Sequence, residues 1–358
     1  MSRLRLSVEW APLVTLLVLW GLFGVLAEDF WSWGTVSLLL QQSAVLALAA
    51  TGLTFVLLCG EIDLSVGMVA LLSACVCGVL WEHPWAAGPQ GQEATRVGGM
   101  GLILVLSLPL LMALTLGWLS GRLTITSGLP SFIITLAMMN IALGLARFLT
   151  RSEKFTVPPQ LAQLGNQAWG LWSGLRLPWA AVLAAAVMVA AHVVLQHTRF
   201  GRYVYMTGGN REAAWLSGIA TGKVVTWCLG ICGLLAGLAG LVNAGRLNSV
   251  SLDQNADLLL DAVACVVLGG TSLFGGEGGI GRTALGVLTF TTLKIGLNLT
   301  NVERLIRRSA LPWGWKQALM EASWVTQFDL LRPFLMGVVL LLALVIHGRL
   351  LGRRSHRA

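Results

Sequence analysis

Two carboxylates close together in a very apolar sequence are the first residues that could do chemistry. Glu61 and Asp63 lie in the stretch GEIDLSVG at 60–67. Carboxylates beside an apolar run are costly unless they meet hydrogen-bond donors or water. Asp63 is well placed to accept from the free N–H groups of a helix that begins at Leu64. The spacing leaves two interpretations open, a helix cap and a direct role of Glu61, Asp63 and Ser65 in gating or solute passage.

Isolated polar side chains inside apolar runs form a second group of candidates. They are Asn140, Asp261, Lys294 and Asn298, and polar groups inside membrane segments are functional candidates by default. A charge at mid-bilayer costs about 2.5–3.5 kcal/mol on insertion scales. We therefore expect Asp261 and Lys294 to face the protein interior or each other, either as a structural ion pair or as part of a solute path.

A glycine-rich run, LGGTSLFGG at 268–276, contains Gly269, Gly270 and Thr271. Glycine at this density lets backbones approach closely, or lets a helix break where freed backbone groups face a water-filled path. Helix packing and a pore role both fit the pattern. Simpler small-xxx-small pairs, predicted to serve packing only, are Gly117 with Gly121 and Gly233 with Gly237.

The longest charged loop, residues 197–223, contains the stretch NREAAWLSG at 210–218. The pattern predicts a short helix that begins near Asn210 and ends at Gly218. This helix would project Ala213, Ala214 and Leu216 as small and apolar contacts. Such a helix can dock in a groove of a soluble partner, and a plain surface helix is the alternative.

The sequence predicts no catalytic residue, no metal site and no cofactor in this chain. GEGGIG at 276–281 fits G-x-G-x-x-G, but no strand is predicted before it and no βαβ unit around it. SGIATGKV at 217–224 lacks the first glycine and the final Ser or Thr of a phosphate loop. The cysteines all fall inside apolar runs without His partners, which favours buried small side chains over disulfides or metal ligands; they are Cys59, Cys75, Cys77, Cys228, Cys232 and Cys265.

The composition shows which solvent surrounds these residues. Of 358 residues, 56% are hydrophobic and 11% are charged, whereas an ordinary soluble domain has about 25% charged residues. The formal charge of +8 does not point to nucleic acid, because Lys and Arg lie mainly in loops between apolar runs. We expect lipid to surround most of the chain.

The apolar runs predict an all-α polytopic membrane protein with about ten transmembrane helices and one domain, 1–358. A helix needs about 20 apolar residues to cross the bilayer, and 258–274 is short and glycine-rich enough to be broken or re-entrant. Once 301–327 is set aside, Lys and Arg favour the segments on the side of the termini, which predicts cytoplasmic termini. The expected spans are 11–27, 36–59, 64–81, 100–120, 130–149, 178–196, 224–242, 258–274, 283–299 and 330–347.

Four stretches in this order resemble the ribose/xylose/arabinose-type permease family of bacterial ABC importers. They are 60–67, GLPSFIITL at 128–136, 199–219 and 268–276, and the likeness spans roughly residues 36–300 and the final helix. The resemblance implies an inner-membrane permease without covalent chemistry of its own. It also implies three kinds of partner, namely two cytoplasmic ATPase subunits, a periplasmic binding protein, and a second permease copy or paralogue.

The stretch from Glu212 through Ala213 and Ala214 to Gly218 is similar to the E-A-A-x-x-x-G coupling loop of ABC importers. By this similarity, the loop would sit on the ATPase and transmit its closure to the solute path. The sequence departs from the family where Leu259 replaces a usual Glu and Arg282 a usual Gly, and 302–325 looks like an insertion on the outer face. These departures point away from a standard pentose and to an altered contact with the binding protein.

We therefore expect a permease for a small polar solute, foremost a sugar. Within the same class, the solute could instead be a nucleoside, a signalling sugar or a branched-chain amino acid. A different class is a secondary transporter driven by ions, with Asp261 and Lys294 as the relay. A structural or receptor membrane protein would carry no solute flux at all.

Overall fold

Helices make up most of the described chain. The computed structural model describes residues 11–300 except 28, 83–98, 171–173 and 256, together with scattered residues between 306 and 341. The helices are α2 (Ala11–Leu26), α3 (Trp33–Leu58), α4 (Val66–Glu82), α5 (Gly99–Ser127), α6 (Ser131–Thr150), α7 (Pro159–Asn166), α8 (Trp179–His197), α9 (Arg199–Gly209), α10 (Arg211–Leu216), α11 (Thr221–Leu247), α12 (Leu258–Leu268) and α13 (Ile280–Leu299).

Two very short antiparallel pairs of strands join the ends of helices. The pairs are β1 (Phe155–Thr156) with β4 (Ser249–Val250), and β2 (Ala168–Gly170) with β3 (Arg176–Pro178). The predicted all-α membrane class is confirmed. In the described part of the chain, α3, α5, α6, α8 and α11 are long and apolar enough to cross a membrane, and α2, α4 and α12 are shorter apolar helices.

The predicted spans agree with these helices except at two places. The first nine predicted spans each coincide with a helix of the described chain, although α12 stops at Leu268 and not at 274. Its 11 residues extend about 16 Å, roughly half of the hydrocarbon core, so the span expected to be broken is indeed interrupted. The tenth span, 330–347, and the segment 302–325 lie mostly outside the described residues.

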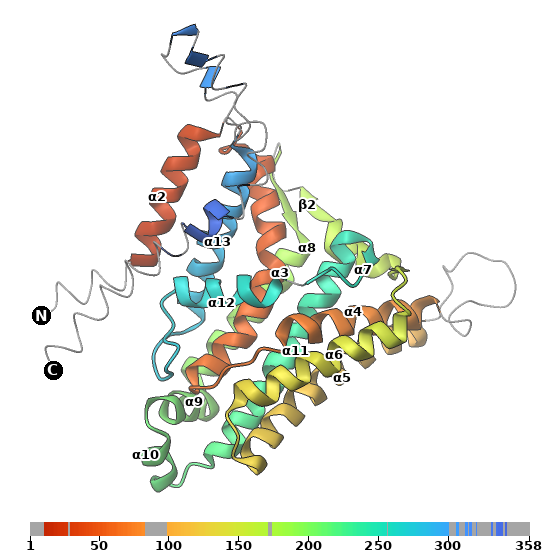
Figure 1. Ribbon diagram of the computed structural model, residues 1–358, viewed down its shortest axis with the longest axis vertical. Helices are drawn as coiled ribbons and strands as arrows, with labels where there is room; N and C mark the ends of the chain where they lie inside the picture. The colour runs from red at the N-terminus through yellow and green to blue at the C-terminus, as the bar shows by residue number, and fades with distance from the viewer. Residues whose placement is uncertain are drawn as a thin grey trace, which may run out of the picture.

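Helix α11 lies at the centre, where α3, α4 and α5 pack around it (Figure 1). Small residues let these helices approach closely. A Cβ atom on Gly117 of α5 would meet the Leu229 carbonyl and lie 3.1 Å from Gly233 of α11. The predicted packing role of the pairs Gly117/Gly121 and Gly233/Gly237 is thus confirmed for α5 against α11.

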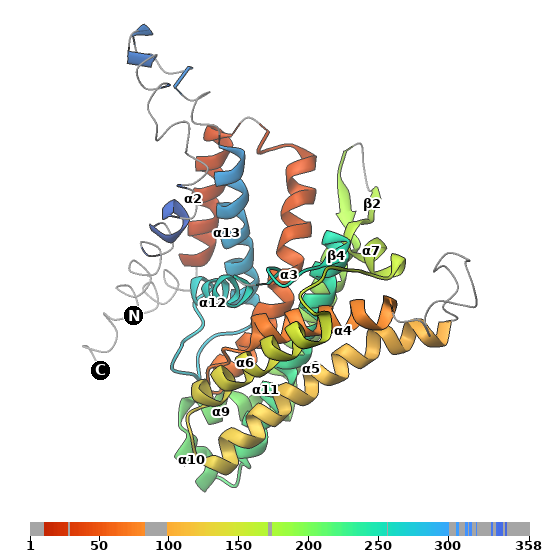
Figure 2. The same ribbon diagram turned by 45° about the vertical axis from the view of Figure 1, so that its right-hand side comes forward.

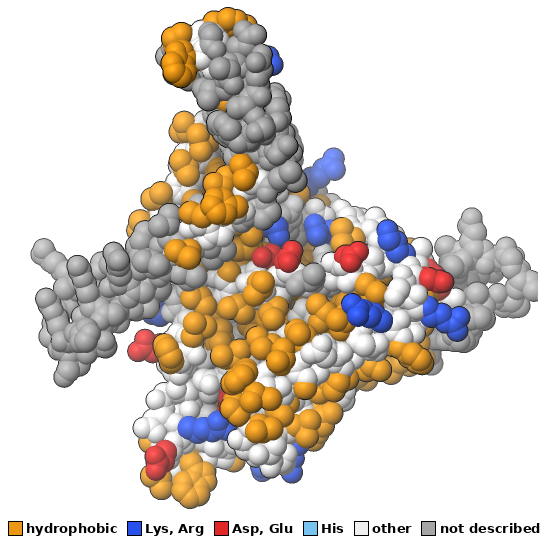
Figure 3. Space-filling model, in the orientation of Figure 1, with side chains coloured by type: hydrophobic (Ala, Val, Ile, Leu, Met, Phe, Trp, Pro, Cys, Tyr) orange, Lys and Arg blue, Asp and Glu red, His pale blue; other side chains and the backbone are white. Residues whose placement is uncertain are grey.

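The helices form two groups that meet at one end of the molecule. Helices α2, α3 and α13 stand side by side, while α4, α5 and α6 run together along another flank (Figures 1 and 2). The short helices α9 and α10 lie at the end where both groups meet, here called the α10 end. Hydrophobic side chains cover much of the face seen in Figure 3, as a lipid-facing surface requires.

Candidate functional site

The connection between α3 and α4, residues 60–65, is held by hydroxyl groups of α6. Gly60 turns the chain at φ 78°, a left-handed conformation that suits glycine. The N–H of Ile62 donates to Ser131 Oγ at 3.0 Å, and the N–H of Leu64 donates to Thr135 Oγ1 at 3.1 Å. Non-helical backbone inside an apolar protein needs such partners. The stretches 60–67 and 128–136 therefore form one structural unit.

Asp63 is buried within this connection, with 1% of its surface exposed. Its Oδ1 atom accepts from the N–H of Ser65 at 2.8 Å and from Ser65 Oγ at 2.6 Å. Burial raises the pKa of the Asp63 carboxyl, although the hydrogen bonds from Ser65 lower it. The predicted helix start at Leu64 is wrong, because α4 begins at Val66. Asp63 stabilises the turn that leads into the helix.

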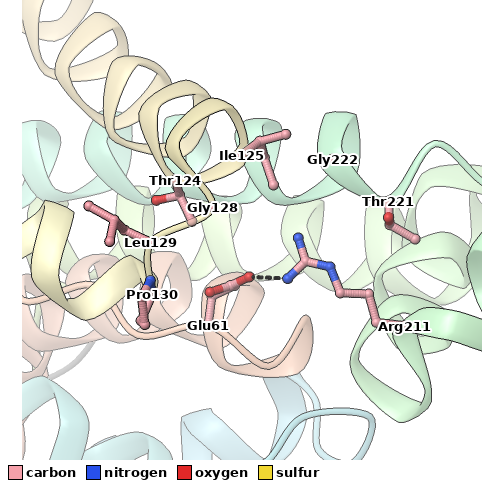
Figure 4. Close-up of a pocket in the computed structure, with 9 residues that line it drawn as sticks. All are labelled: Glu61, Thr124, Ile125, Gly128, Leu129, Pro130, Arg211, Thr221 and Gly222. Carbon is pink, nitrogen blue, oxygen red and sulfur yellow. Dashed lines mark hydrogen bonds and ion pairs between the residues drawn. The ribbon is translucent and has the colours of Figure 1, made fainter.

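Glu61 forms an ion pair with Arg211, the first residue of α10. The Nη1 atom of Arg211 donates to Glu61 Oε1 at 2.7 Å, and the Glu61 side chain is 9% exposed against 48% for Arg211. The two side chains point toward each other from the 60–65 connection and from α10 (Figure 4). The pair therefore joins the predicted coupling segment directly to the predicted gate.

A pocket of about 400 Å³ surrounds this ion pair. Its walls come from the end of α5, the turn before α6, and the beginnings of α10 and α11 (Figure 4). The residues that line it are Glu61, Thr124, Ile125, Gly128, Leu129, Pro130, Arg211, Thr221 and Gly222. The ion pair is therefore not enclosed by the close packing that is typical of a protein interior.

Helix α10 has the capped ends that the sequence predicts. Asn210 Oδ1 accepts from the N–H of Ala213 at 2.9 Å, and Gly218 adopts φ 82° just beyond the helix. The predicted contact face is partly wrong, because Ala214 is buried in the protein. The large exposed apolar side chains of the helix are Trp215 and Leu216, at 65% and 72% exposure. Its neighbour α9 begins after Thr198, whose hydroxyl accepts from the N–H of Gly201.

The glycine-rich run, 268–276, contacts the end of α3 and the end of α9. The N–H of Gly276 donates to the carbonyl of Leu58, the last residue of α3, at 2.9 Å. A Cβ on Gly208, near the end of α9, would overlap that same carbonyl. A Cβ on Gly275 would lie 2.8 Å from the Gly208 carbonyl. All four sequence motifs therefore converge around the end of α3.

The first residues of that run, 269–271, lie directly after α12 and contact the beginning of α13. A Cβ on Gly269 would collide with the Arg282 carbonyl, and Arg282 Nη1 donates to the Gly270 carbonyl at 3.4 Å. Gly270 itself adopts φ 88°. Thr271 is buried, and its hydroxyl has no hydrogen-bond partner in the described part of the chain. Arg282 thus satisfies a carbonyl freed where α12 ends.

Asp261 and Lys294 face each other, as predicted. Lys294 Nζ of α13 donates to Asp261 Oδ2 of α12 at 2.9 Å. The Asp261 side chain is 11% exposed and that of Lys294 is 41% exposed. The geometry is that of an ion pair between two adjacent helices, which lowers the cost of both charges inside a membrane protein.

The remaining predicted residues lie apart from this cluster. Asn140 is exposed on α6, and its Nδ2 atom donates to the Leu136 carbonyl of its own helix at 3.0 Å. Asn298 is exposed near the end of α13. The structure therefore brings Glu61, Asp63 and Ser65 together with α10, and leaves both asparagines outside.

Three residues that contribute to this site were not predicted from the sequence. The hydroxyls of Ser131 and Thr135 are one helical turn apart, a spacing that places both on one face of a helix starting after Pro130. That signal was available in the sequence. The partner of Glu61, Arg211, was not predictable, because the two residues are 150 positions apart.

Comparison with known proteins identifies the kind of molecule that carries this geometry. The family described as "Branched-chain amino acid transport system / permease component" matches residues 35–344. The chain belongs to this family of permease components. As a permease component it is a multi-pass protein of the inner membrane, and no solved structure matches it.

Individual relatives of this permease are named for ribose, autoinducer 2 and fructose. The ribose import permease protein of Escherichia coli (strain K12) is 35% identical over 299 residues, which cover 82% of this chain and 87% of the relative. The autoinducer 2 import system permease protein of Photorhabdus luminescens is 29% identical over 343 residues, 96% and 90% of the two chains. The fructose import permease protein of Rhizobium meliloti is 30% identical over 308 residues, 84% and 81%. The predicted membership among carbohydrate permeases of ABC importers is confirmed.

Proposed function

We propose that this permease forms the path by which an ATP-driven importer carries a sugar or sugar-like solute. The relatives named above are import permeases for ribose, autoinducer 2 and fructose, which supports this solute class over the branched-chain amino acids of the family description. Nucleosides and branched-chain amino acids remain the alternatives within the class. The solute path itself requires no cofactor in this chain.

The observation that carries the proposal is the ion pair between Glu61 and Arg211. Helix α10 presents Trp215 and Leu216 outward, so a soluble subunit can grip it as an apolar helix in a groove. Helix α10 is also tied through Arg211 to the 60–65 connection, which is bonded to α6. A displacement of α10 is therefore passed to α3, α4 and α6.

The proposal also includes the partners and the orientation of the chain in the membrane. ATP hydrolysis belongs to separate cytoplasmic subunits that bind α10, so the α10 end and both termini are cytoplasmic. A periplasmic binding protein delivers the solute at the opposite face. A second permease copy or paralogue completes the path, and the whole chain, 1–358, acts as one domain.

Two groups of residues receive roles in this proposal. The ATPase-coupling group consists of Asn210, Glu212, Ala213, Ala214 and Gly218. The gating and path group consists of Glu61, Asp63, Ser65, Asn140, Asp261, Gly269, Gly270, Thr271 and Asn298. Asp63 and Ser65 act by holding the turn before α4, while Glu61 acts through its ion pair.

Reconstitution in proteoliposomes tests the proposal. The permease is assembled with its ATPase and binding protein, and uptake of D-ribose, D-fructose, a nucleoside and L-leucine is measured with and without ATP. We expect ATP-dependent uptake of a sugar that a proton uncoupler does not change. Uptake that is abolished by the uncoupler and needs no ATPase would instead establish an ion-coupled transporter with Asp261 and Lys294 as its relay.

A further inference from the structure

Phe274 is the most exposed large hydrophobic side chain of the residues that the structure describes, at 92%, and the adjacent Leu273 is 45% exposed. Both lie in the loop between α12 and α13. Together, these two adjacent side chains form an exposed apolar patch that a partner could cover.

The loop that carries Phe274 is rigidly built. The N–H of Phe274 donates to Ser272 Oγ at 3.1 Å, and the N–H of Ser272 donates to the Glu277 carbonyl at 2.9 Å. The N–H of Gly276 is bound to the Leu58 carbonyl. A loop whose backbone is fixed before binding loses little conformational entropy when a partner covers it, which suits a loop that carries a binding anchor.

The same loop is packed directly on the junction between α9 and α10. A Cβ on Gly276 would lie 2.8 Å from Gly209 Cα, and one on Gly275 would lie 2.9 Å from Gly60 Cα. Only Asn210 separates Gly209 from α10. Both views place the loop beside α9 at the α10 end (Figures 1 and 2). The loop that carries Phe274 is therefore packed beside the residues that lead into α10.

We propose that Phe274 is a second anchor for the ATPase subunit that binds α10, a role that rests on the proposed function. A soluble subunit broad enough to hold α10 also meets the adjoining loop. It needs two apolar pockets, one for Trp215 and Leu216 and one for Phe274. The close contacts between the loop and α9 keep the two anchors at a constant spacing, so the subunit grips the permease as a rigid unit.

Photo-cross-linking in the assembled complex tests this directly. The photoreactive residue p-benzoylphenylalanine replaces Phe274, Leu216 or Val25 in separate preparations in lipid nanodiscs. Val25 of α2 is 84% exposed and serves as the lipid-facing control. We expect covalent adducts with the ATPase from positions 274 and 216, and none from position 25.

The remaining outcomes separate the two claims. Adducts with the ATPase from 216 alone, or adducts of 274 with lipid or with the second permease, would overturn the role of Phe274 and leave the function of α10 intact. The absence of ATPase adducts from both positions would reject the proposed function as well. Adducts from 274 alone would retain the loop contact and reject α10 as the docking helix.

A binding measurement supplies a second readout. Phe274→Ser is expected to weaken the binding of the purified ATPase to the permease in nanodiscs about tenfold, the ordinary size of an anchor residue's contribution. Phe274→Leu keeps an apolar side chain and should restore most of the affinity. Equal affinity of the serine variant and the unaltered protein would overturn the anchor role.

Discussion

Arg211 donates a hydrogen bond of 2.7 Å to Glu61, a residue 150 positions earlier in the chain. One partner begins the short helix α10, and the other lies in the turn between α3 and α4. Because Glu61 is buried and Arg211 is half exposed, the pair connects a surface helix with the interior. In the proposed function, this contact is the mechanical link between ATPase docking and the solute path.

The contact between α9 and the end of α3 leads to a stability prediction. A methyl group at Gly208 would overlap the Leu58 carbonyl, whereas one at Gly209 meets nothing within 4 Å. Gly208→Ala should therefore lower the free energy of unfolding by about 1–3 kcal/mol, the usual cost of overpacking. Thermal denaturation of the two purified variants checks this. An equal loss of stability in Gly209→Ala would show that the α3 contact is not responsible.

The hydroxyl of Thr135 should stabilise the 60–65 connection. Thr135→Val keeps the shape but removes the acceptor for the N–H of Leu64, and an unpaired buried donor costs about 1–3 kcal/mol. The matched control is Thr126→Val, because Thr126 is exposed and bonds only within its own helix. We expect a lower melting temperature and faster hydrogen exchange at Leu64 in the first variant alone. Unchanged exchange at Leu64 would contradict the arrangement.

The ion pair between Asp261 and Lys294 gives a prediction that separates structure from proton transfer. Asp261→Asn leaves Lys294 without its partner, and since that lysine is 41% exposed we expect a loss of about 1 kcal/mol. The double variant Asp261→Leu with Lys294→Met should be more stable than the single one, because neither charge is left alone. Denaturation of the three proteins checks this order.

Transport assays complete that experiment. If the pair is structural, ATP-driven uptake by the double variant should be insensitive to an uncoupler, as we expect for the unaltered protein. Uptake that becomes independent of pH only when Asp261 is removed would instead assign the pair to a proton relay.

The sequence predicts best where a rule is local. The start of α10 after Asn210 and its end before Gly218 follow from side-chain capping and from the conformational freedom of glycine. The interruption after α12 follows from the density of glycine at 268–276. Both were predictable because neighbours along the chain decide them.

Long-range relationships decide the features that the sequence did not predict. Ala214 turns inward and Trp215 outward because α10 rests on the protein with one face, and the helix pattern alone does not say which. The start of α4 at Val66 instead of Leu64 depends on Thr135, which holds the N–H of Leu64 outside the helix. Likewise, only the fold brings the 60–65 connection, α10 and the glycine-rich run to the end of α3.

The most direct test of the account is a charge exchange between Glu61 and Arg211. Each single reversal, Glu61→Arg or Arg211→Glu, places like charges together and should lower ATP-driven solute uptake about fivefold, the ratio that corresponds to about 1 kcal/mol for a half-exposed pair. The ATPase should remain bound and active in these variants. The double variant, Glu61→Arg with Arg211→Glu, should recover most of the uptake per ATP hydrolysed. Full uptake by both single variants, or no recovery by the double one, would contradict the claim that this ion pair transmits the motion of α10.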